Sequence, residues 1–233
     1  MPFKAKSFDL PIYSPQVLEE KRMILIACEG KNTEFQYFNG IKNTLTLKNL
    51  VKMEVIEREK NQANSSAPTR VVETLQNLDE NRLNEIKERN SFEDSYDVFW
   101  IVVDREKQSS KLKNLTKAIE ICDRENFNVG LVNPAFEFWL LLHVTDISSY
   151  DRKLLFENKK NRSKSKKRYL EIELGRLLNG YDKGKLKLSH FVSIEKIKFA
   201  ISQEKLFQNN REKILHELGS NLSELLIEIL DMN

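Results

Sequence analysis

Residues 23–30 read MILIACEG, an apolar run that stops at an acidic residue and a glycine. A short run without interior polar residues is typical of a strand buried on both faces, as in a parallel sheet. A second such run, DVFWIVV at Asp97–Val103, also ends on acidic residues, in Asp104-Arg105-Glu106. These two segments predict the central strands of a parallel sheet.

Helical and extended patterns alternate around these strands. Helices are predicted from Thr33-Glu34 onward, after Pro68, over Lys111–Arg124 and over Phe136–His143, and further strands over Val51–Val55 and Phe127–Val132. Strict alternation of strands and helices predicts an α/β fold with a largely parallel sheet flanked by helices.

The pattern changes after Val144, where the strands stop. From Tyr169 onward only helical patterns remain, over Tyr169–Leu178, Phe191–Phe207 and Arg211–Leu230. We therefore divide the chain into four parts: an irregular lead-in at 1–21, an α/β core at 22–145, a basic loop at 146–168 and a C-terminal helical region at 169–233.

Composition excludes several protein classes. The 38 Lys and Arg nearly balance the 35 Asp and Glu, so the chain is not basic throughout. Its two cysteines, Cys28 and Cys122, make neither a disulfide framework nor a CxxC zinc motif. We see no signal peptide and no apolar run near the ~20 residues that span a bilayer, and we expect a cytoplasmic protein with no membrane partner. Without a GxxxxGK[ST] motif, ATP hydrolysis by this chain is not expected.

Acidic side chains follow both central strands. Glu29 comes directly after the first, and Asp104 and Glu106 come directly after the other. Ligands of open parallel sheets bind beyond the carboxyl ends of the strands, where these three carboxylates are expected to meet. Clustered carboxylates repel one another unless a cation neutralises them, and their oxygens suit Mg²⁺ or Mn²⁺. The alternative is that these loops are acidic because they are exposed and near helix N-termini.

Three motifs carry a family resemblance. Residues 29–38, EGKNTEFQYF, are similar to the EGxxTExxYF signature of the RloB-like family; residues 96–106, YDVFWIVVDRE, resemble its YDxxWxxxDRD segment; and residues 133–143, NPAFEFWLLLH, resemble its NPxFExWLLLH segment. A shorter match is Tyr181-x-Lys183 to a YxK element. The sequence departs from the family at Glu106, where Asp is usual, and lacks its C-terminal NPxT-like element.

The resemblance implies a Toprim-like core, the metal-binding fold of topoisomerases, primases and some nucleases. On that basis Glu29 corresponds to the Toprim glutamate and Asp104 with Glu106 to its DxD pair, as ligands of Mg²⁺ or Mn²⁺. The family is associated with prokaryotic anti-phage abortive-infection loci, often beside an AAA-type ATPase partner.

Other candidate residues have two interpretations each. Glu34 and Glu137 either stabilise helix starts or belong to the site, where Glu137 binds or orients a ligand. Asn133 is a turn residue or a phosphate contact, and Lys183 is a candidate phosphate contact. His143, at the end of an apolar helix, is better explained as a core histidine than as a general base. The aromatic residues of these motifs are expected in the core.

One stretch of the chain is strongly basic. Residues 159–168, KKNRSKSKKR, hold seven basic residues and no acidic one. Such a stretch is either a solvated loop or a nucleic-acid contact that neutralises phosphates. Its candidate contacts are Lys159, Lys160, Arg162, Lys164, Lys166, Lys167 and Arg168.

Together these features predict a metal-dependent nuclease of an anti-phage system, acting with an ATPase partner. Glu29, Asp104, Glu106 and Glu137 are the candidate catalytic residues. The alternative is a non-catalytic sensor or adaptor subunit that binds nucleic acid for the ATPase. The sequence does not decide whether the substrate is DNA or RNA. It also leaves the oligomeric state open, and a homo-oligomer is possible.

Overall fold

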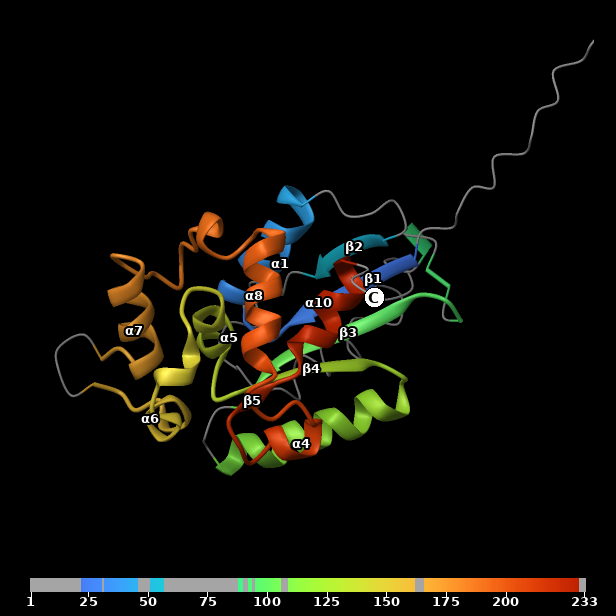
Figure 1. The fold of residues 1–233 in the computed structure, drawn as a ribbon. Coiled ribbons are helices and arrows are strands. Elements are labelled where there is room, and N and C mark those ends of the chain that lie inside the picture. The colour runs from blue at the N-terminus through green and yellow to red at the C-terminus, as the bar shows by residue number, and fades with distance from the viewer. Residues whose placement is uncertain are drawn as a thin grey trace, which may run out of the picture.

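The computed structural model describes residues 22–30, 32–45, 51–56, 88–89, 92–93, 95–105, 109–161 and 166–230, with the backbone alone at 51–56 and 109–111. Figure 1 shows the chain folded around one sheet, with helices on both of its faces. The strands are β1 (Arg22–Cys28), β2 (Val51–Ile56), β3 (Val98–Asp104), β4 (Asn128–Asn133) and β5 (Gly219–Ser220). The helices are α1 (Thr33–Thr44), α4 (Ser109–Arg124), α5 (Phe136–Leu142), α6 (Arg152–Glu157), α7 (Tyr169–Leu177), α8 (Ile194–Glu204), α9 (Arg211–Ile214) and α10 (Leu222–Leu230), with short 3-10 turns η2 (Ile147–Ser149) and η3 (Leu188–His190).

The sheet has the strand order β2-β1-β3-β4-β5 within the described residues. β1, β2, β3 and β4 are parallel, and β5 pairs antiparallel with β4. Because the chain moves outward from β1 to β2 and then returns to the other side of β1 with β3, the order reverses between β1 and β3. The crevice outside the carboxyl ends of such a strand pair is the usual ligand site of open parallel sheets.

Both faces of the sheet are covered, which explains the uninterrupted apolar run of β1. Ile24, Ile26 and Cys28 face a core formed with α1, α5, α7, α8 and α10. Met23, Leu25 and Ala27 face a second core, closed mainly by α4. Alternate side chains of a strand point to opposite faces, so a strand in the middle layer needs apolar residues at every position. The predicted α/β fold with a largely parallel, helix-flanked sheet is confirmed.

The C-terminal region differs from the prediction of helices alone. The helix expected over Arg211–Leu230 is broken into α9 and α10, with β5 between them. The Asn221 side chain accepts a hydrogen bond from the Leu131 N–H (2.7 Å) and donates one to the Val129 carbonyl (2.9 Å), both in β4. Gly219 lies so close to the Gln208 carbonyl that a Cβ has no room. Pairing with β4 therefore replaces a helical turn here.

The range predicted as a basic loop also contains regular structure. Asp151 caps α6 by accepting hydrogen bonds from the N–H groups of Lys153 (2.7 Å) and Leu154 (3.3 Å), and Leu155 of that helix is buried. The lead-in at 1–21, the helix expected after Pro68 and Glu106 lie outside the described residues. No helix in the described ranges is long and apolar enough to cross a bilayer.

Candidate metal site and nucleic-acid surface

Glu29 and Asp104 meet at the carboxyl ends of the two central strands. The Glu29 N–H donates to the Val102 carbonyl at 2.9 Å, which continues the β1–β3 pairing by one residue. The Glu29 carboxylate in turn accepts a hydrogen bond from the Asp104 N–H, with 3.3 Å between nitrogen and oxygen. Glu29 is 8% exposed and Asp104 is half-buried. The structure therefore brings together two of the three residues that were expected to meet here.

Two further carboxylates join them from helix N-termini. Glu34 is in the first turn of α1 and Glu137 in the first turn of α5, and both are buried. The Glu34 carboxylate lies against Gly30, where a Cβ would occupy the same space. The stabilisation of a helix dipole does not require a carboxylate to be buried. The burial of both favours the second interpretation, that they are part of the site.

The four carboxylates act on one another electrostatically. Burial raises the pKa of Asp104 well above its usual value, and the charges of Glu34, Glu137 and Glu29 raise it further. A hydrogen bond from the Phe136 N–H, at the start of α5, acts in the opposite direction. Burial also raises the pKa of Glu34, to about 7, with contributions from Glu137 and Glu29. A divalent cation would relieve this repulsion.

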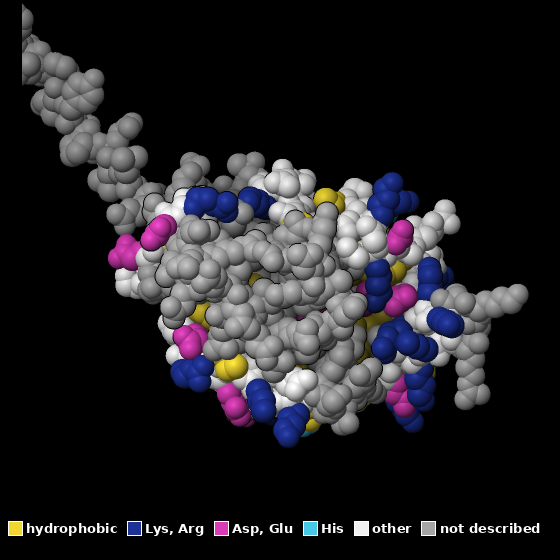
Figure 2. Space-filling model, turned by 180° about the vertical axis from the view of Figure 1, so that it is seen from behind, with side chains coloured by type: hydrophobic (Ala, Val, Ile, Leu, Met, Phe, Trp, Pro, Cys, Tyr) yellow, Lys and Arg dark blue, Asp and Glu magenta, His cyan; other side chains and the backbone are white. Residues whose placement is uncertain are grey.

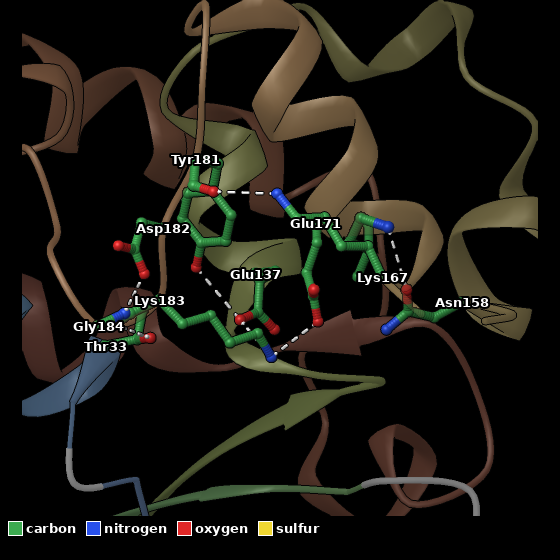
Figure 3. Close-up of polar contacts among 10 residues, drawn as sticks. Thr33, Glu137, Asn158, Lys167, Glu171, Tyr181, Asp182, Lys183 and Gly184 are labelled. Carbon is green, nitrogen blue, oxygen red and sulfur yellow. Dashed lines mark hydrogen bonds and ion pairs between the residues drawn. The ribbon is translucent and has the colours of Figure 1, made fainter. Parts of the chain in front are cut away.

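A loop from the C-terminal region brings a lysine to this acidic cluster, defined here as Glu29, Glu34, Asp104 and Glu137. The Lys183 Nζ lies 2.8 Å from Glu137 Oε1 and 3.0 Å from Oε1 of Glu171, a residue of α7 (Figure 3). The Tyr181 hydroxyl donates to the same Glu137 oxygen at 3.2 Å. Burial alone would lower the pKa of Lys183, but the charge of Glu137 and the hydrogen bonds with Glu137 and Glu171 hold it above its usual value.

The lysine loop, residues 181–186, is held against α1 by backbone contacts. The Thr33 hydroxyl donates to the Lys183 carbonyl at 3.3 Å. The Gln36 amide donates to the Gly184 carbonyl at 3.2 Å, and its oxygen accepts from the Leu186 N–H at 2.9 Å. The Lys183 side chain is therefore placed by the same helix that carries Glu34. Glu171 was not among the residues expected at the site, because an acid in a first helical turn gives no signal of its partner.

The basic stretch borders this loop. Lys160 and Arg168 form an antiparallel bridge, and the Asn161 N–H donates to the Lys167 carbonyl at 2.8 Å. The Lys167 Nζ donates to the Tyr181 carbonyl at 3.3 Å, which connects the stretch to the lysine loop. Lys159, Lys160, Lys166 and Lys167 are exposed, although Lys159 pairs with Glu157 at 2.8 Å. Arg162 and Lys164 lie outside the described residues.

The charged surface beside the site is mixed in sign. Seen from behind, Lys and Arg side chains gather on the side of the molecule that carries α6 and α7, with acidic side chains among them (Figure 2). Basic residues at the rim and acidic residues in the interior are the arrangement expected where a polyanion approaches a metal site.

Two other candidates belong to the core. His143 is 3% exposed; its Nδ1 lies 2.9 Å from the Trp139 carbonyl, and its Nε2 lies 3.0 Å from the Tyr37 hydroxyl. Burial lowers its pKa to about 3, so it is neutral at physiological pH and the core interpretation holds. Asn133, at the end of β4, is 1% exposed and donates to the Ile214 carbonyl at 2.6 Å, which places its amide away from solvent.

Sequence comparison agrees with the motifs of this site. The family model described as RloB-like protein matches residues 24–229. The chain belongs to the RloB-like family. The match begins inside β1 and ends inside α10, so it covers the acidic cluster, the basic stretch and the lysine loop of this RloB-like chain. No curated protein and no solved structure matches it significantly.

The donor chemistry of the cluster fits a hard divalent cation. Every side chain of the cluster offers carboxylate oxygens, the ligand type of Mg²⁺ and Mn²⁺. Across the residues that the structure covers, no three His, Cys, Asp or Glu side chains already converge in the geometry of a metal site. The third carboxylate expected from the sequence, Glu106, falls outside them. Lys183 instead supplies positive charge to Glu137.

Proposed function

We propose that this RloB-like chain is a metal-dependent nuclease, in which Glu29, Asp104 and Glu106 bind one or two Mg²⁺ or Mn²⁺ ions. One observation carries the proposal: beside the carboxyl ends of β1 and β3, where the strand order reverses, Asp104 is held next to Glu29 and feels the charges of the three buried carboxylates Glu29, Glu34 and Glu137. Repulsion among these carboxylates lowers the stability of the fold. Groups with perturbed pKa values that gather at a ligand-binding position of the sheet are candidates for a functional site.

The parts of the site have distinct roles in this proposal. A divalent cation held by these residues would supply Lewis-acid chemistry, namely activation of water and stabilisation of the charge that develops on the scissile phosphate. Glu29 and Asp104 hold their positions through the β1–β3 pairing, and Glu106 comes two residues after Asp104 in the sequence. Glu137, on α5, orients the metal ligands. Tyr181 and Lys183 contact the Glu137 carboxylate and fix its position in the absence of metal.

Nucleic acid is the substrate class that the surface favours. The exposed lysines of residues 159–168 lie beside the lysine loop and supply affinity for phosphates without a sequence preference. A small phosphate ester would not need so many cations. Family membership adds the proposed setting, an anti-phage abortive-infection system of the cytoplasm with an AAA-type ATPase as partner.

The test is cleavage of mixed DNA and RNA by the purified chain in Mn²⁺, with and without the ATPase, compared with EDTA. Asp104→Ala should abolish cleavage and leave nucleic-acid binding largely intact, because the metal stabilises the transition state more than the bound substrate. Glu120→Gln, an exposed residue of α4, is the matched control. Cleavage by Asp104→Ala at the wild-type rate would refute the assignment.

The second candidate is a non-catalytic sensor or adaptor for the ATPase. The pairing of Lys183 with Glu137 favours it, since part of the acidic charge is already compensated within the chain. The two functions separate in a melting experiment without substrate. A nuclease of the proposed kind should gain thermal stability in Mn²⁺ relative to EDTA, whereas an adaptor with a structural cluster should not.

A further inference from the structure

Lys183 contacts the acidic cluster, and its two carboxylate partners differ. Its partner Glu137 belongs to the cluster and has a side chain only 4% exposed, while the Lys183 side chain is 46% exposed. Its other partner, Glu171, sits on α7 outside the cluster. The ammonium of this half-exposed side chain therefore joins a buried carboxylate of the cluster to a carboxylate of α7, and Figure 3 shows Lys183 between Glu137 and Glu171.

We propose that Lys183 is an exchangeable counter-ion. Its ammonium pairs with Glu137 while the site holds no metal, and it pairs with a substrate phosphate once the metal is bound. The inference rests on the proposed function and adds a residue that couples metal binding to nucleic-acid binding. Lys183 is a substrate-binding residue in this scheme, because its ammonium contacts first Glu137 and then the phosphate.

Electrostatics gives the direction of the exchange. With no metal, the nearest positive charge that Glu137 contacts is the ammonium at 2.8 Å. A divalent cation among the four carboxylates neutralises them and repels the ammonium, so the Lys183–Glu137 pair weakens when the metal binds. A lysine has a flexible stem and a compact charge, which lets it change partners without moving the backbone.

The contacts around Lys183 favour a short movement over complete release. Thr33 holds the Lys183 carbonyl, and Gln36 holds the backbone on either side of Lys185, so the loop itself is anchored to α1. The ion pair with Glu171 keeps the ammonium close to the acidic cluster after the Lys183–Glu137 pair has broken. Lys167 donates a hydrogen bond to the Tyr181 carbonyl, which places the basic stretch next to the lysine loop.

The rival explanation is a permanent structural pair that joins α5 to α7 through Glu137 and Glu171. In that case removal of the ammonium lowers thermal stability equally with and without metal, and nucleic-acid affinity does not depend on Lys183. The two explanations therefore differ in how the effect of one substitution responds to metal.

The first arm of the test measures Mn²⁺ binding without nucleic acid, from the electron paramagnetic resonance signal of free Mn²⁺. Lys183→Met should bind Mn²⁺ about tenfold more tightly than wild type, because a competing positive charge is gone. Lys183→Arg keeps the charge and should stay near wild type. Lys185→Met is the matched control, since Lys185 is exposed on the same loop and makes no ion pair with a described residue.

The second arm measures binding of a labelled DNA duplex by fluorescence anisotropy, in Ca²⁺ and in EDTA. Lys183→Met should bind the duplex about three- to tenfold more weakly in Ca²⁺ and as tightly as wild type in EDTA. Its salt slope in Ca²⁺ should be lower by about 0.9, because one phosphate is no longer neutralised. Lys185→Met should behave alike in both solutions.

Each failure has its own meaning. If wild type binds no Mn²⁺, both the proposed metal site and the exchange of Lys183 partners are refuted. If wild type binds Mn²⁺ but Lys183→Met binds it no more tightly, the exchange alone is refuted. Equal losses of DNA affinity in Ca²⁺ and EDTA, or no loss in either, also overturn the exchange and leave the proposed nuclease standing.

Discussion

The Asp104 N–H donates a hydrogen bond to the Glu29 carboxylate, with 3.3 Å between the two atoms. This contact ties the acidic residue after β1 to the last residue of β3, across the point where the strand order reverses. It holds Glu29 beside Asp104 by main-chain geometry, independently of any ligand. The position of a first carboxylate pair is therefore a property of the sheet, and the remaining charges are arranged around it.

Gly30→Ala tests whether the packing of Glu34 matters to the site. An added Cβ overlaps the Glu34 carboxylate, which must move within a buried space. We expect a loss of about 1–3 kcal/mol in the free energy of unfolding and a smaller stabilisation by Mn²⁺. Urea denaturation with and without Mn²⁺ measures both.

The matched control is Gly175→Ala, in α7. A Cβ there meets only the Tyr181 nitrogen at 3.9 Å, an ordinary contact. Alanine favours a helix over glycine by about 1 kcal/mol, so this variant should be as stable as wild type or more so, with unchanged Mn²⁺ dependence. The same response from both glycines would contradict the role given to Gly30.

The basic stretch should supply affinity and not catalysis. Replacing Lys164, Lys166, Lys167 and Arg168 by Ser should weaken nucleic-acid binding and lower the log–log salt slope by up to about 0.9 for each duplex phosphate that is no longer neutralised. Turnover at saturating substrate should change little, because the proposed chemistry belongs to the acidic cluster and these cations only neutralise phosphates. Binding titrations at several salt concentrations and single-turnover rates are the measurements. An unchanged salt slope would favour a solvated stretch, and turnover abolished at saturation would place it inside the active site.

Glu204 makes stability depend on pH. This residue of α8 is 1% exposed and accepts hydrogen bonds from the Ser223 N–H (3.2 and 3.3 Å) at the start of α10. Burial raises the pKa of Glu204 to about 7. Hydrogen bonds from Ser220 and Ser223 lower this pKa, but they offset only part of the effect of burial. Because the folded-state pKa lies above the unfolded value, its stabilising effect is complete below pH ~4.5 and is lost as pH rises through 7.

Glu204→Gln should remove this dependence. Relative to wild type, the variant should gain about 2 kcal/mol in the free energy of unfolding between pH 5 and pH 8. Glu212→Gln, at an exposed position of α9, serves as control and should follow the wild-type curve. Parallel curves for wild type and Glu204→Gln would show that Glu204 does not titrate in this range.

Asn133→Ala separates structure from binding at the end of β4. The variant leaves the buried Ile214 carbonyl without the amide donor that lies 2.6 Å away. We expect a loss of about 1–3 kcal/mol in stability and no change in nucleic-acid affinity under conditions where the protein is folded. Thermal denaturation and a DNA-binding titration check the two halves. Weaker DNA binding by the folded variant would instead support a phosphate contact at Asn133.

Several features followed from local sequence alone. The apolar runs at Met23–Cys28 and Phe99–Val103 required strands buried on both faces, and that requirement favours a parallel sheet covered by helices. The acids that follow these runs had to lie at one edge of the sheet, because parallel strands end on the same side. The three family motifs, with family membership, pointed to the same edge.

Other features had no local signal. The break of Arg211–Leu230 around β5 depends on Asn221, whose side chain bonds to β4, and on the closeness of Gly219 to Gln208. The apolar periodicity of α10 continues through the break, so sequence reasoning joined α9 and α10 into one helix. A two-residue strand is too short to show an alternating pattern.

The sequence by itself determined the layered α/β core and the residues that end its strands, since these depend on runs of neighbouring side chains. Tertiary structure alone decided that Glu34 and Glu137 are buried beside Asp104, that Lys183 sits between Glu137 and Glu171, and that Glu204 is enclosed beneath α10. These relations join segments far apart in the chain, and the energy of a buried charge depends on which distant groups surround it.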